Sequence, residues 1–281
     1  MSDTNEAAPP DPTGPAAGPG STVPRILAVA NQKGGVGKTT TAINLGTALA
    51  ATGRQVLIVD LDPQGNASTG VGCGQADRAR SAYHVLFGEH SLSETIRPTG
   101  IPGLSLVPSS VDLSGAEIEL VEAERREARL RQALRPLPPG IDYVFVDCPP
   151  SLGLLTLNAL VAADAVLVPL QCEFYALEGL SQLLKTIDRV RRGFNPKLEI
   201  HGVLLTMFDR RNNLSDMVAQ DVRGHLGPTV YETMIPRNVR VSEAPSHGKP
   251  VLLYDVNCTG SQAYVKLAGE LLKRDKRLSA A

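Results

Sequence analysis

Short apolar runs alternate along this chain with segments whose hydrophobic residues recur at helical spacing. The apolar runs predict a first strand that starts at Arg25. Further strands are predicted over residues 55–61, 104–107, 141–147, 165–170, 198–207, 229–235 and 251–253. The helical segments cover residues 40–51, 82–87, 92–96, 114–134, 177–191 and 261–273. This alternation indicates an α/β domain whose twisted, mostly parallel sheet of about seven or eight strands has helices on both faces.

Local signals mark two of the predicted helix boundaries. Gly53 is a candidate C-cap for the first helix, because glycine adopts the left-handed conformation freely. Ser114 and Glu117 have the spacing of a capping box, which places the start of the long helix over 114–134 at Ser114.

The two ends of the chain differ from the part between them. Residues 1–22 are rich in Pro, Gly, Ala and small polar residues and show no hydrophobic periodicity, so we expect a disordered N-terminal tail. Residues 23–276 contain all of the predicted elements and are expected to form one domain. Residues 277–281 would then be a short C-terminal tail.

The composition narrows the class of protein. Hydrophobic residues make up 42% of the chain and aromatic ones only 4%, so alanine, valine and leucine must fill the core. The net charge of −1 indicates no polyanion partner, so any nucleic-acid surface must be a local patch. The four cysteines lack metal-ligand spacing and suit a reducing compartment. Without an apolar run of bilayer length or a signal-peptide pattern, we expect a soluble, cytoplasmic protein.

A glycine-rich bend between the first strand and the first helix is the most informative stretch. It reads KGGVGKTT over residues 33–40, and its glycines let successive backbone N–H groups turn inward around an anion. Lys38 can reach terminal phosphates, the Thr39 hydroxyl can ligate Mg²⁺, and the helix directs its positive end at the same charge. The stretch is therefore predicted to be the phosphate-binding loop of a P-loop NTPase domain. It has Gln32 where glycine is usual, and an additional lysine, Lys33.

Aspartates follow two of the predicted strands. Asp60 and Asp62 lie two residues apart at the end of the second strand, and so on one face of it, and Asp147 ends a later strand. Open α/β sheets place Mg²⁺ and water chemistry at such carboxylates beside a phosphate-binding loop. We expect Thr39, Asp62 and Asp147 to converge there; the alternative for Asp60 is that it caps the following turn.

From this loop onward the chain resembles the ParA/MinD group of P-loop ATPases. The resemblance rests on the deviant Walker A sequence KGGVGKTT and on the stretches DLDPQGNAS, VDCPPSLGLL, CEFYALEGL and IPRNVRVSEAPSHGKP. Together these are similar to the chromosomal ParA/Soj branch and span nearly the whole chain from Arg25. The strand end TMFD at residues 206–209 lacks the NKxD pattern of guanine recognition, which favours ATP.

The resemblance implies ATP and Mg²⁺ as cofactors and gives each matching position a role. The residues expected around the nucleotide are Lys33, Gly34, Gly35, Val36, Gly37, Lys38, Thr39 and Thr40, with Pro236 and Asn238 against the base or ribose. The residues expected around the metal are Thr39, Asp62 and Asp147.

Three of these residues carry the catalysis that the resemblance implies. Lys38 would bind the β- and γ-phosphates, and Asp62 would orient or activate the attacking water. Lys33 would reach across an ATP-dependent homodimer and neutralise the partner's phosphate charge, as an arginine finger does. Such an enzyme is slow as a monomer, since its site is complete only in the dimer.

The resemblance also implies non-specific double-stranded DNA and a ParB-like centromere-binding protein as partners, with nucleoid association. Residues 185–249 carry eleven Lys and Arg against seven Asp and Glu, so this region is relatively basic. Arg211 and Arg240 match the family's DNA-binding positions, and a patch duplicated in a dimer would double its phosphate contacts. An ordinary solvated face would account for the charge equally well.

Two other functions share the loop and the fold. A MinD-like membrane-cycling ATPase would need a C-terminal helix that inserts large apolar residues into lipid. Here that helix has Leu267, Leu271 and Leu272 on one face and no Phe or Trp, which favours a packing helix and no stable membrane association. A metabolic ATP-dependent ligase would need a pocket for a carboxylate substrate, which the sequence does not identify.

Overall fold

The computed structural model describes residues 23–278. The tail predicted over residues 1–22 lies outside the described residues, and so do residues 279–281 of the tail predicted over 277–281. The first two residues of that second tail continue the last helix, which ends at Leu278.

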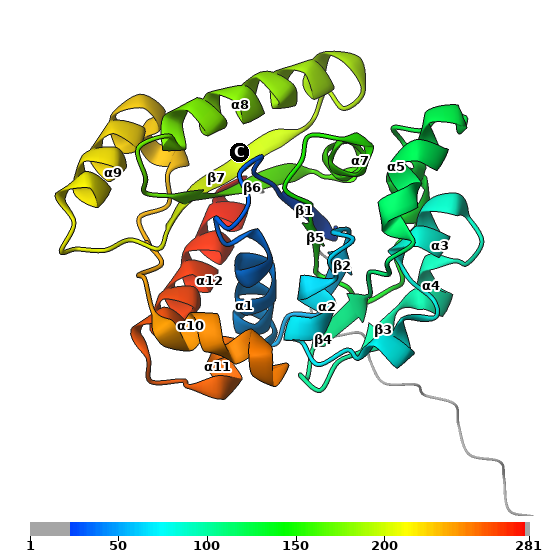
Figure 1. Cartoon of the computed structure of the whole chain (residues 1–281), viewed down its shortest axis with the longest axis horizontal. Helices are drawn as coiled ribbons and strands as arrows, with labels where there is room; N and C mark the ends of the chain where they lie inside the picture. The colour runs from blue at the N-terminus through cyan, green and yellow to red at the C-terminus, as the bar shows by residue number, and fades with distance from the viewer. Residues whose placement is uncertain (1–22, 279–281) are drawn as a thin grey trace, which may run out of the picture.

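A seven-stranded sheet forms the centre of the molecule (Figure 1). Its order is β3-β4-β2-β5-β1-β6-β7, with β1 over Arg25–Val29, β2 over Val56–Asp60, β3 over Arg97–Pro98, β4 over Leu104–Val107, β5 over Tyr143–Asp147, β6 over Ala165–Gln171 and β7 over Glu199–Thr206. Neighbouring strands are parallel, except that β3 is antiparallel to β4. The prediction of an α/β domain with a mostly parallel sheet is confirmed, whereas β3 was not predicted.

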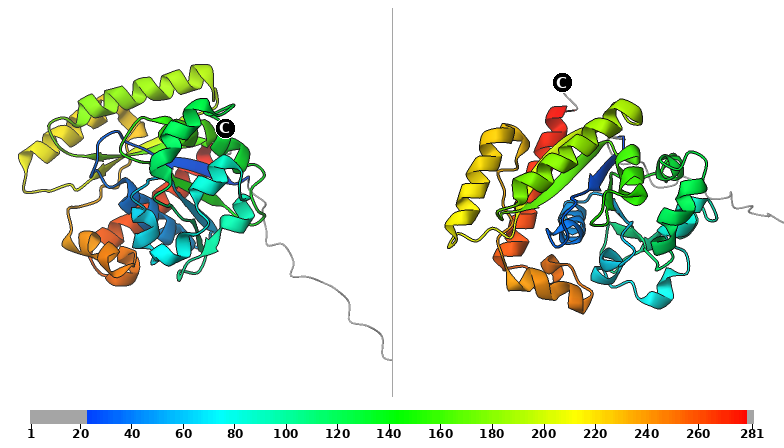
Figure 2. Two further views of the ribbon diagram at one scale, coloured as in Figure 1. Left: turned by 45° about the vertical axis from the view of Figure 1, so that its right-hand side comes forward. Right: turned by 45° about the horizontal axis from the view of Figure 1, so that its top comes forward.

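Helices cover both faces of this sheet, and the views in Figure 2 show α8 and α1 on opposite sides of it. One face packs against α1 (Lys38–Ala50), α11 (Val251–Tyr254) and α12 (Thr259–Leu278). The other packs against α3 (Ala82–Phe87), α5 (Leu113–Glu122), α6 (Arg129–Ala133), α7 (Leu154–Ala162), α8 (Ala176–Gly193) and α9 (Asn213–Leu226). Short helices α2 (Asn66–Gly70), α4 (Leu92–Thr95) and α10 (Val239–Glu243) lie in the connections.

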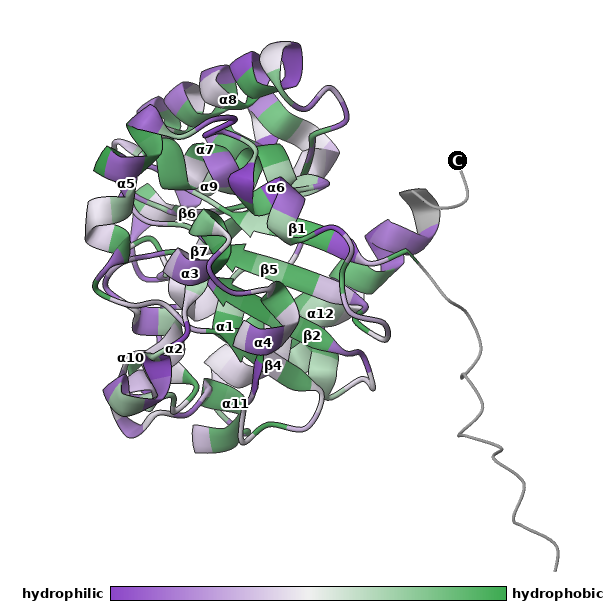
Figure 3. Ribbon diagram, turned by 90° about the vertical axis from the view of Figure 1, so that its right-hand side faces the viewer, coloured by the Kyte–Doolittle hydropathy of each residue, from purple (hydrophilic) through white to green (hydrophobic). Residues whose placement is uncertain are grey.

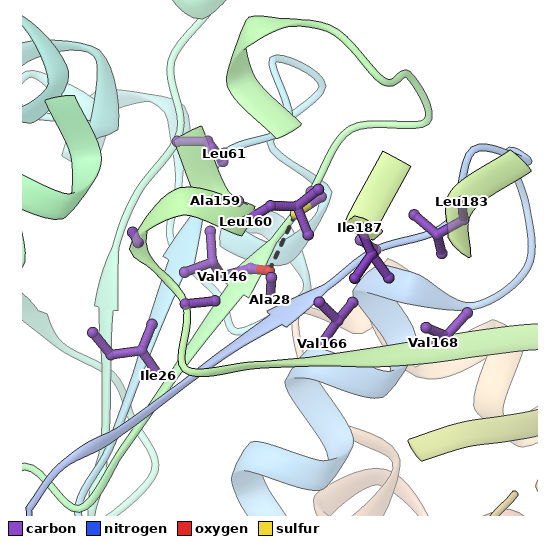
Figure 4. Close-up of a cluster of buried hydrophobic side chains, with 14 of the residues drawn as sticks. Ile26, Ala28, Leu61, Val146, Ala159, Leu160, Val166, Val168, Leu183 and Ile187 are labelled. Carbon is purple, nitrogen blue, oxygen red and sulfur yellow. Dashed lines mark hydrogen bonds between the residues drawn. The ribbon is translucent and has the colours of Figure 1, made fainter. Parts of the chain in front are cut away.

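Alternation of side chains along each strand divides the core into two layers. In β1, Ile26 and Ala28 belong to the layer under α7 and α8 (Figure 4), whereas Leu27 and Val29 belong to the layer under α1 and α12. Figure 3 shows β1 and β5 in hydrophobic colours along most of their length. Continuous hydrophobic strands are what a parallel sheet buried on both faces requires.

The single helix predicted over 114–134 is wrong, because the chain there forms α5 and α6 with a break between them. Arg125 adopts a left-handed conformation, with φ of +51°. Asn158 of α7 then binds both sides of the break: its amide donates to the Arg126 carbonyl (2.7 Å) and accepts from the Leu130 N–H (3.1 Å). The capping box is wrong as well, since α5 begins at Leu113.

The strand predicted over 229–235 is also wrong, although isolated bridges join Val230 and Pro236 to the end of the sheet. Side chains of α12 take the backbone groups that a strand would pair. Arg274 donates to the carbonyls of residues 229 and 230, and the Glu270 carboxylate accepts from the N–H groups of residues 232 and 233. These side chains replace only part of a ladder, since the N–H groups of Tyr231 and Ile235 still donate to the Val203 and Leu205 carbonyls of β7, each at 2.9 Å.

The short strand predicted over 251–253 is instead the one-turn helix α11. Pro250 precedes this helix and its carbonyl accepts from the N–H groups of Leu253 and Tyr254, each at 3.0 Å. The Asn44 side chain on α1 accepts from the Val251 N–H at 2.7 Å, which satisfies the first donor of the turn.

Helix α12 packs into the core, as predicted. Leu267 and Leu271 have no exposed surface, and both pack in the layer that contains α1. Within residues 23–278, no helix combines the length and the hydrophobicity that crossing a bilayer requires.

The packing around Gly202 of β7 gives a test of the fold. A Cβ atom at this position would lie 2.5 Å from the ring of Tyr231, so Gly202→Ala should lower the free energy of unfolding by about 1–3 kcal/mol. The matched control is Gly179→Ala on α8, where an added Cβ atom has no neighbour within 4 Å. Because alanine has the higher helix propensity, this variant should raise the free energy of unfolding by at most about 1 kcal/mol. Urea unfolding of both variants measures the difference; equal stability would contradict the packing described here.

Candidate functional site

The glycine-rich loop between β1 and α1 has the backbone of an anion cradle. Gly35 and Gly37 have φ of +73° and +89°, in the region that favours glycine. Gly37 is the N-cap of the 13-residue helix α1. The N–H groups of the first turn of this helix, which have no partner within the helix, therefore face the loop and can bind an anion. Val36 is buried, and its carbonyl accepts a hydrogen bond of 2.8 Å from the Thr206 hydroxyl, which ties the loop to the end of β7.

A cavity of about 400 Å³ lies in front of this loop. Seven of the predicted site residues line it, namely Gly34, Gly35, Gly37, Lys38, Thr39, Thr40 and Asp62. The others that line it are Ile43, Asn44, Gln64, Asn66, Thr69, Gly70, Pro150, Met207, Pro245, Lys249 and Pro250. The size suits a small-molecule ligand.

The far end of the cavity differs from the sequence-based expectation. Pro236 and Asn238 are not among its lining residues; Asn238 instead caps α10, where its side chain accepts from the Arg240 N–H at 2.8 Å. Met207 and Lys249 do line the cavity, and Met207 has an unusual φ of +50° for a residue with a side chain. Both belong to stretches that the sequence marked as informative, but their spacing gave no sign of a role. Base contact by Pro236 and Asn238 stays a prediction.

The two lysines of the loop have different surroundings. Lys38 is buried, and its Nζ donates to the Lys33 carbonyl at 3.0 Å. Burial lowers the pKa of Lys38, while the nearby carboxylates of Asp147 and Asp62 oppose the shift. Lys33 is not among the residues that line the cavity, and its ammonium forms an ion pair with Glu173. The two side chains of that pair are 41% and 46% exposed.

Asp60 and Asp147 are paired in register on the neighbouring strands β2 and β5, and both are fully buried. One oxygen of Asp60 accepts from the Ser68 N–H (2.7 Å) and hydroxyl (2.6 Å), so Asp60 does cap the following turn. Burial raises the pKa of Asp60 to about 6, although the hydrogen bonds from Ser68 oppose the shift.

Asp147 is a buried carboxylate at the end of β5 whose oxygens could ligate a metal ion. Both of its carboxylate oxygens are buried and have no hydrogen-bond partner within residues 23–278. Burial and the neighbouring Asp60 raise the pKa of Asp147 well above its usual range, while the hydroxyl of Thr39 and the ammonium of Lys38 act in the opposite direction. These residues fit a bound divalent cation, whose charge would compensate the carboxylate.

A magnesium ion at this point would depend mainly on ligands other than protein side chains. Among the described residues, no cluster of three or more His, Cys, Asp or Glu side chains could hold a metal. Mg²⁺ characteristically keeps several waters and binds through one or two protein groups plus substrate phosphates. Thr39 and Asp147 are suited to supply those protein groups.

Asp62 lines the cavity on a braced turn. It is 6% exposed, and one carboxylate oxygen accepts from the Gln64 N–H at 3.0 Å. The Ser109 hydroxyl donates to the Asp62 carbonyl at 2.6 Å, and the Ser109 N–H donates to the Ser68 hydroxyl at 3.0 Å. These hydrogen bonds hold both the carboxylate and the backbone of Asp62 at the edge of the cavity.

The predicted DNA-binding arginines both have acidic partners in this chain. Arg211 is 88% exposed and binds Asp209 through two hydrogen bonds of 3.0 Å, which lower the pKa of Asp209 to about 2. Arg240 is 54% exposed and pairs with Glu243 at 3.1 Å. Such exposed pairs contribute only about 0–1 kcal/mol, so a phosphate can displace them.

The sequence of this chain is similar to those of known proteins. A model described as an AAA domain matches residues 24–200. The chain is 62% identical over 254 residues to the chromosome partitioning protein ParA of Caulobacter vibrioides, which covers 90% of this chain and 95% of that protein. It is 52% identical over 247 residues to the sporulation initiation inhibitor protein Soj of Bacillus subtilis, covering 88% and 98% of the two chains.

Solved structures show the same architecture. The cobyrinic acid a,c-diamide synthase of Mycobacterium smegmatis, crystallised with ADP and magnesium, has a TM-score of 0.79 at 41% identity and covers 90% of this chain and 96% of its own. The cell division ATPase MinD of Pyrococcus furiosus has a TM-score of 0.74 at 27% identity, covering 89% and 98%. The long matches to ParA and Soj, together with the loop and its two lysines, show that this chain belongs to the ParA/Soj family of chromosome-partitioning P-loop ATPases.

Proposed function

We propose that this chain is an ATP-dependent switch for DNA partitioning. It binds ATP with Mg²⁺, dimerises, binds double-stranded DNA non-specifically, and is released when a ParB-like protein stimulates ATP hydrolysis. The observation that carries the proposal is the position of Lys33, which lies on the phosphate-binding loop but does not line the cavity of its own chain. Its side chain is 41% exposed, so a second copy that covers this face could reach the ammonium by displacing Glu173.

Each residue of the cavity has a defined task in this proposal. Lys38 and the N–H groups of the loop bind the terminal phosphates, and Asp62 orients the water that attacks the γ-phosphate. Mg²⁺, held by Thr39 and Asp147, would neutralise phosphate charge when bound. Phosphoryl transfer depends largely on positioning and charge neutralisation, so a chain that lacks the partner's Lys33 should hydrolyse ATP slowly.

Met207, Lys249 and Pro250 are suited to the nucleoside part of ATP. They line the cavity together with the phosphate-binding loop, and Pro250 leads directly into α11, which Asn44 fixes to α1. Apolar side chains can pack against the base, and the Lys249 ammonium can bind a polar atom of the nucleotide.

The two rival functions make different demands. A membrane-cycling ATPase would need its apolar C-terminal face for lipid, yet Leu267 and Leu271 are buried against the rest of the domain. The similarity to the Mycobacterium smegmatis synthase structure, at 41% identity, supports a function as a metabolic ligase. The similarity to ParA is higher, at 62% identity over a similar share of the chain. ATP turnover stimulated by DNA and a ParB-like protein, with no effect of small carboxylic acids, would separate partitioning from ligation.

Asp62→Ala tests the water-orienting role. The variant should bind ATP and form ATP-dependent dimers normally but lower kcat by about 100-fold or more, the size of a lost general base. Phosphate release under saturating ATP measures kcat, and a fluorescent ATP analogue measures binding. Lys38→Ala is the control, because it should abolish nucleotide binding itself. Turnover by Asp62→Ala at the wild-type rate would remove Asp62 from the mechanism.

Glu173→Gln tests whether the ion pair competes with dimerisation. Freeing Lys33 from an exposed pair worth about 0–1 kcal/mol should lower the Kd of the ATP-bound dimer by up to about fivefold. Analytical ultracentrifugation with ATP measures the Kd, and Glu178→Gln on α8 controls for the loss of one negative charge. A weaker dimer would show that Glu173 contacts the partner rather than restraining Lys33.

Arg211→Glu and Arg240→Glu test the DNA surface. The backbones on which these residues lie are adjacent, since the Arg237 N–H donates to the Phe208 carbonyl at 3.0 Å. Each substitution should weaken DNA binding and reduce the salt dependence of the affinity by about two phosphate contacts per dimer, while ATP-dependent dimers persist. Lys266→Glu on the exposed side of α12 is the control. DNA affinity equal to that of the control would exclude the patch.

A further inference from the structure

Arg78 is a buried cation behind the nucleotide cavity. It ends the short 3₁₀ turn over Gln75–Arg78 and is only 9% exposed. Within residues 23–278 it forms no ion pair with a carboxylate, and its Nε has no hydrogen-bond partner. Burying a guanidinium without a counter-charge is costly, so the hydrogen bonds that Arg78 does form must offset that cost.

The guanidinium holds the far end of the α2 segment. Its Nη2 donates to the Thr69 hydroxyl at 2.8 Å and to the Cys73 carbonyl at 2.9 Å. Thr69 and the adjacent Gly70 line the nucleotide cavity, but Arg78 itself does not. Arg78 therefore contacts a residue that lines the cavity without lining the cavity itself.

The same guanidinium packs against the near end of the segment at Gly65. A Cβ atom on Gly65 would lie 2.2 Å from Nη1 of Arg78, so a larger residue there would force the guanidinium to move. Gly65 has φ of +63°, and its N–H donates to the Asp62 carbonyl at 2.9 Å, which closes the turn that carries Asp62. One side chain thus braces both the turn after Asp62 and the end of α2.

We infer that Arg78 is a positioning residue for ATP hydrolysis, which acts by fixing Asp62 and α2 against the terminal phosphates. The inference rests on the proposed role of Asp62 in orienting water. Phosphoryl transfer is sensitive to misplacement of about 1 Å, so loosening the turn should affect the chemical step more than the binding of ATP. Affinity for the nucleotide comes mainly from the phosphate-binding loop, which Arg78 does not contact.

Arg78→Ala tests this split between chemistry and binding. The variant should lower kcat at least tenfold while the Kd for a fluorescent ATP analogue changes less than about threefold. Arg78→Lys should restore part of kcat, because one ammonium can replace one of the two hydrogen bonds but not the planar fork. Arg80→Ala, an exposed arginine of the same segment, is the control and should retain wild-type kcat. Turnover by Arg78→Ala within twofold of wild type, or equal loss of kcat and affinity, would overturn the inference.

A double-mutant cycle with Gly65→Ala tests the contact itself and does not need Arg78→Ala to be fully stable. Gly65→Ala should lower kcat strongly in the wild-type chain, since the methyl group displaces the guanidinium. In the Arg78→Ala background the same change should cost less, because only the left-handed backbone strain remains. Additive effects of the two substitutions on kcat would contradict the contact between Arg78 and Gly65.

The outcome for Asp62 is separate from the outcome for Arg78. If Asp62→Ala stops hydrolysis and Arg78→Ala does not, the positioning role fails and the proposed function stands. If Arg78→Ala lowers kcat while Asp62→Ala leaves it unchanged, the water-orienting role of Asp62 fails, and so does the positioning role that rests on it.

Discussion

The structure depends on the balance of charge at the carboxyl ends of β2 and β5. Asp60, Asp62 and Asp147 bring three carboxyl groups to one place, and Lys38 is the cation that lies among them. Burial makes this negative charge expensive, as the raised pKa values of Asp60 and Asp147 show. A nucleoside triphosphate would add more negative charge. The site can therefore work only when further cations arrive, which are a divalent metal and, by our proposal, a lysine from a second chain.

The fold brings the charged groups together without strain in the strands. Parallel strands end at the same edge of the sheet, so β1 can deliver the loop while β2 and β5 deliver the carboxylates. The helices cover both faces, and the cavity in front of the phosphate-binding loop lies at this edge. Around the site, positive φ values occur in the loops, at Gly35, Gly37, Gly65 and Met207.

The parts of the site that the sequence predicted are those whose chemistry lies within a short stretch. The loop with Lys38 and Thr39 is one continuous motif, Asp62 directly follows a predicted strand, and Asp147 ends another. The parts it missed depend on contacts between distant segments. Met207 and Lys249 line the cavity only because β7 and the chain before α11 fold over the loop, and Arg78 lies behind Gly65 through a turn that has no pattern.

The errors in secondary structure have the same cause. Helical spacing continued from α5 into α6, but Asn158 of α7 binds the backbone groups between them. The apolar run at residues 229–235 resembled a strand, yet Arg274 and Glu270 of α12 bind four of its backbone groups. In both places side chains from elsewhere in the fold replaced the local backbone pairing that the sequence pattern indicated.

Mixing two inactive variants tests most directly whether Lys33 acts on the other chain. A Lys33→Ala copy keeps its own Asp62, and an Asp62→Ala copy keeps its own Lys33, so a mixed dimer contains one complete site. An equimolar mixture with ATP should recover about a quarter of wild-type turnover, since half of randomly formed dimers are mixed and each has one working site of two. Turnover in the mixture no higher than in either variant alone would show that Lys33 does not complete the partner's site.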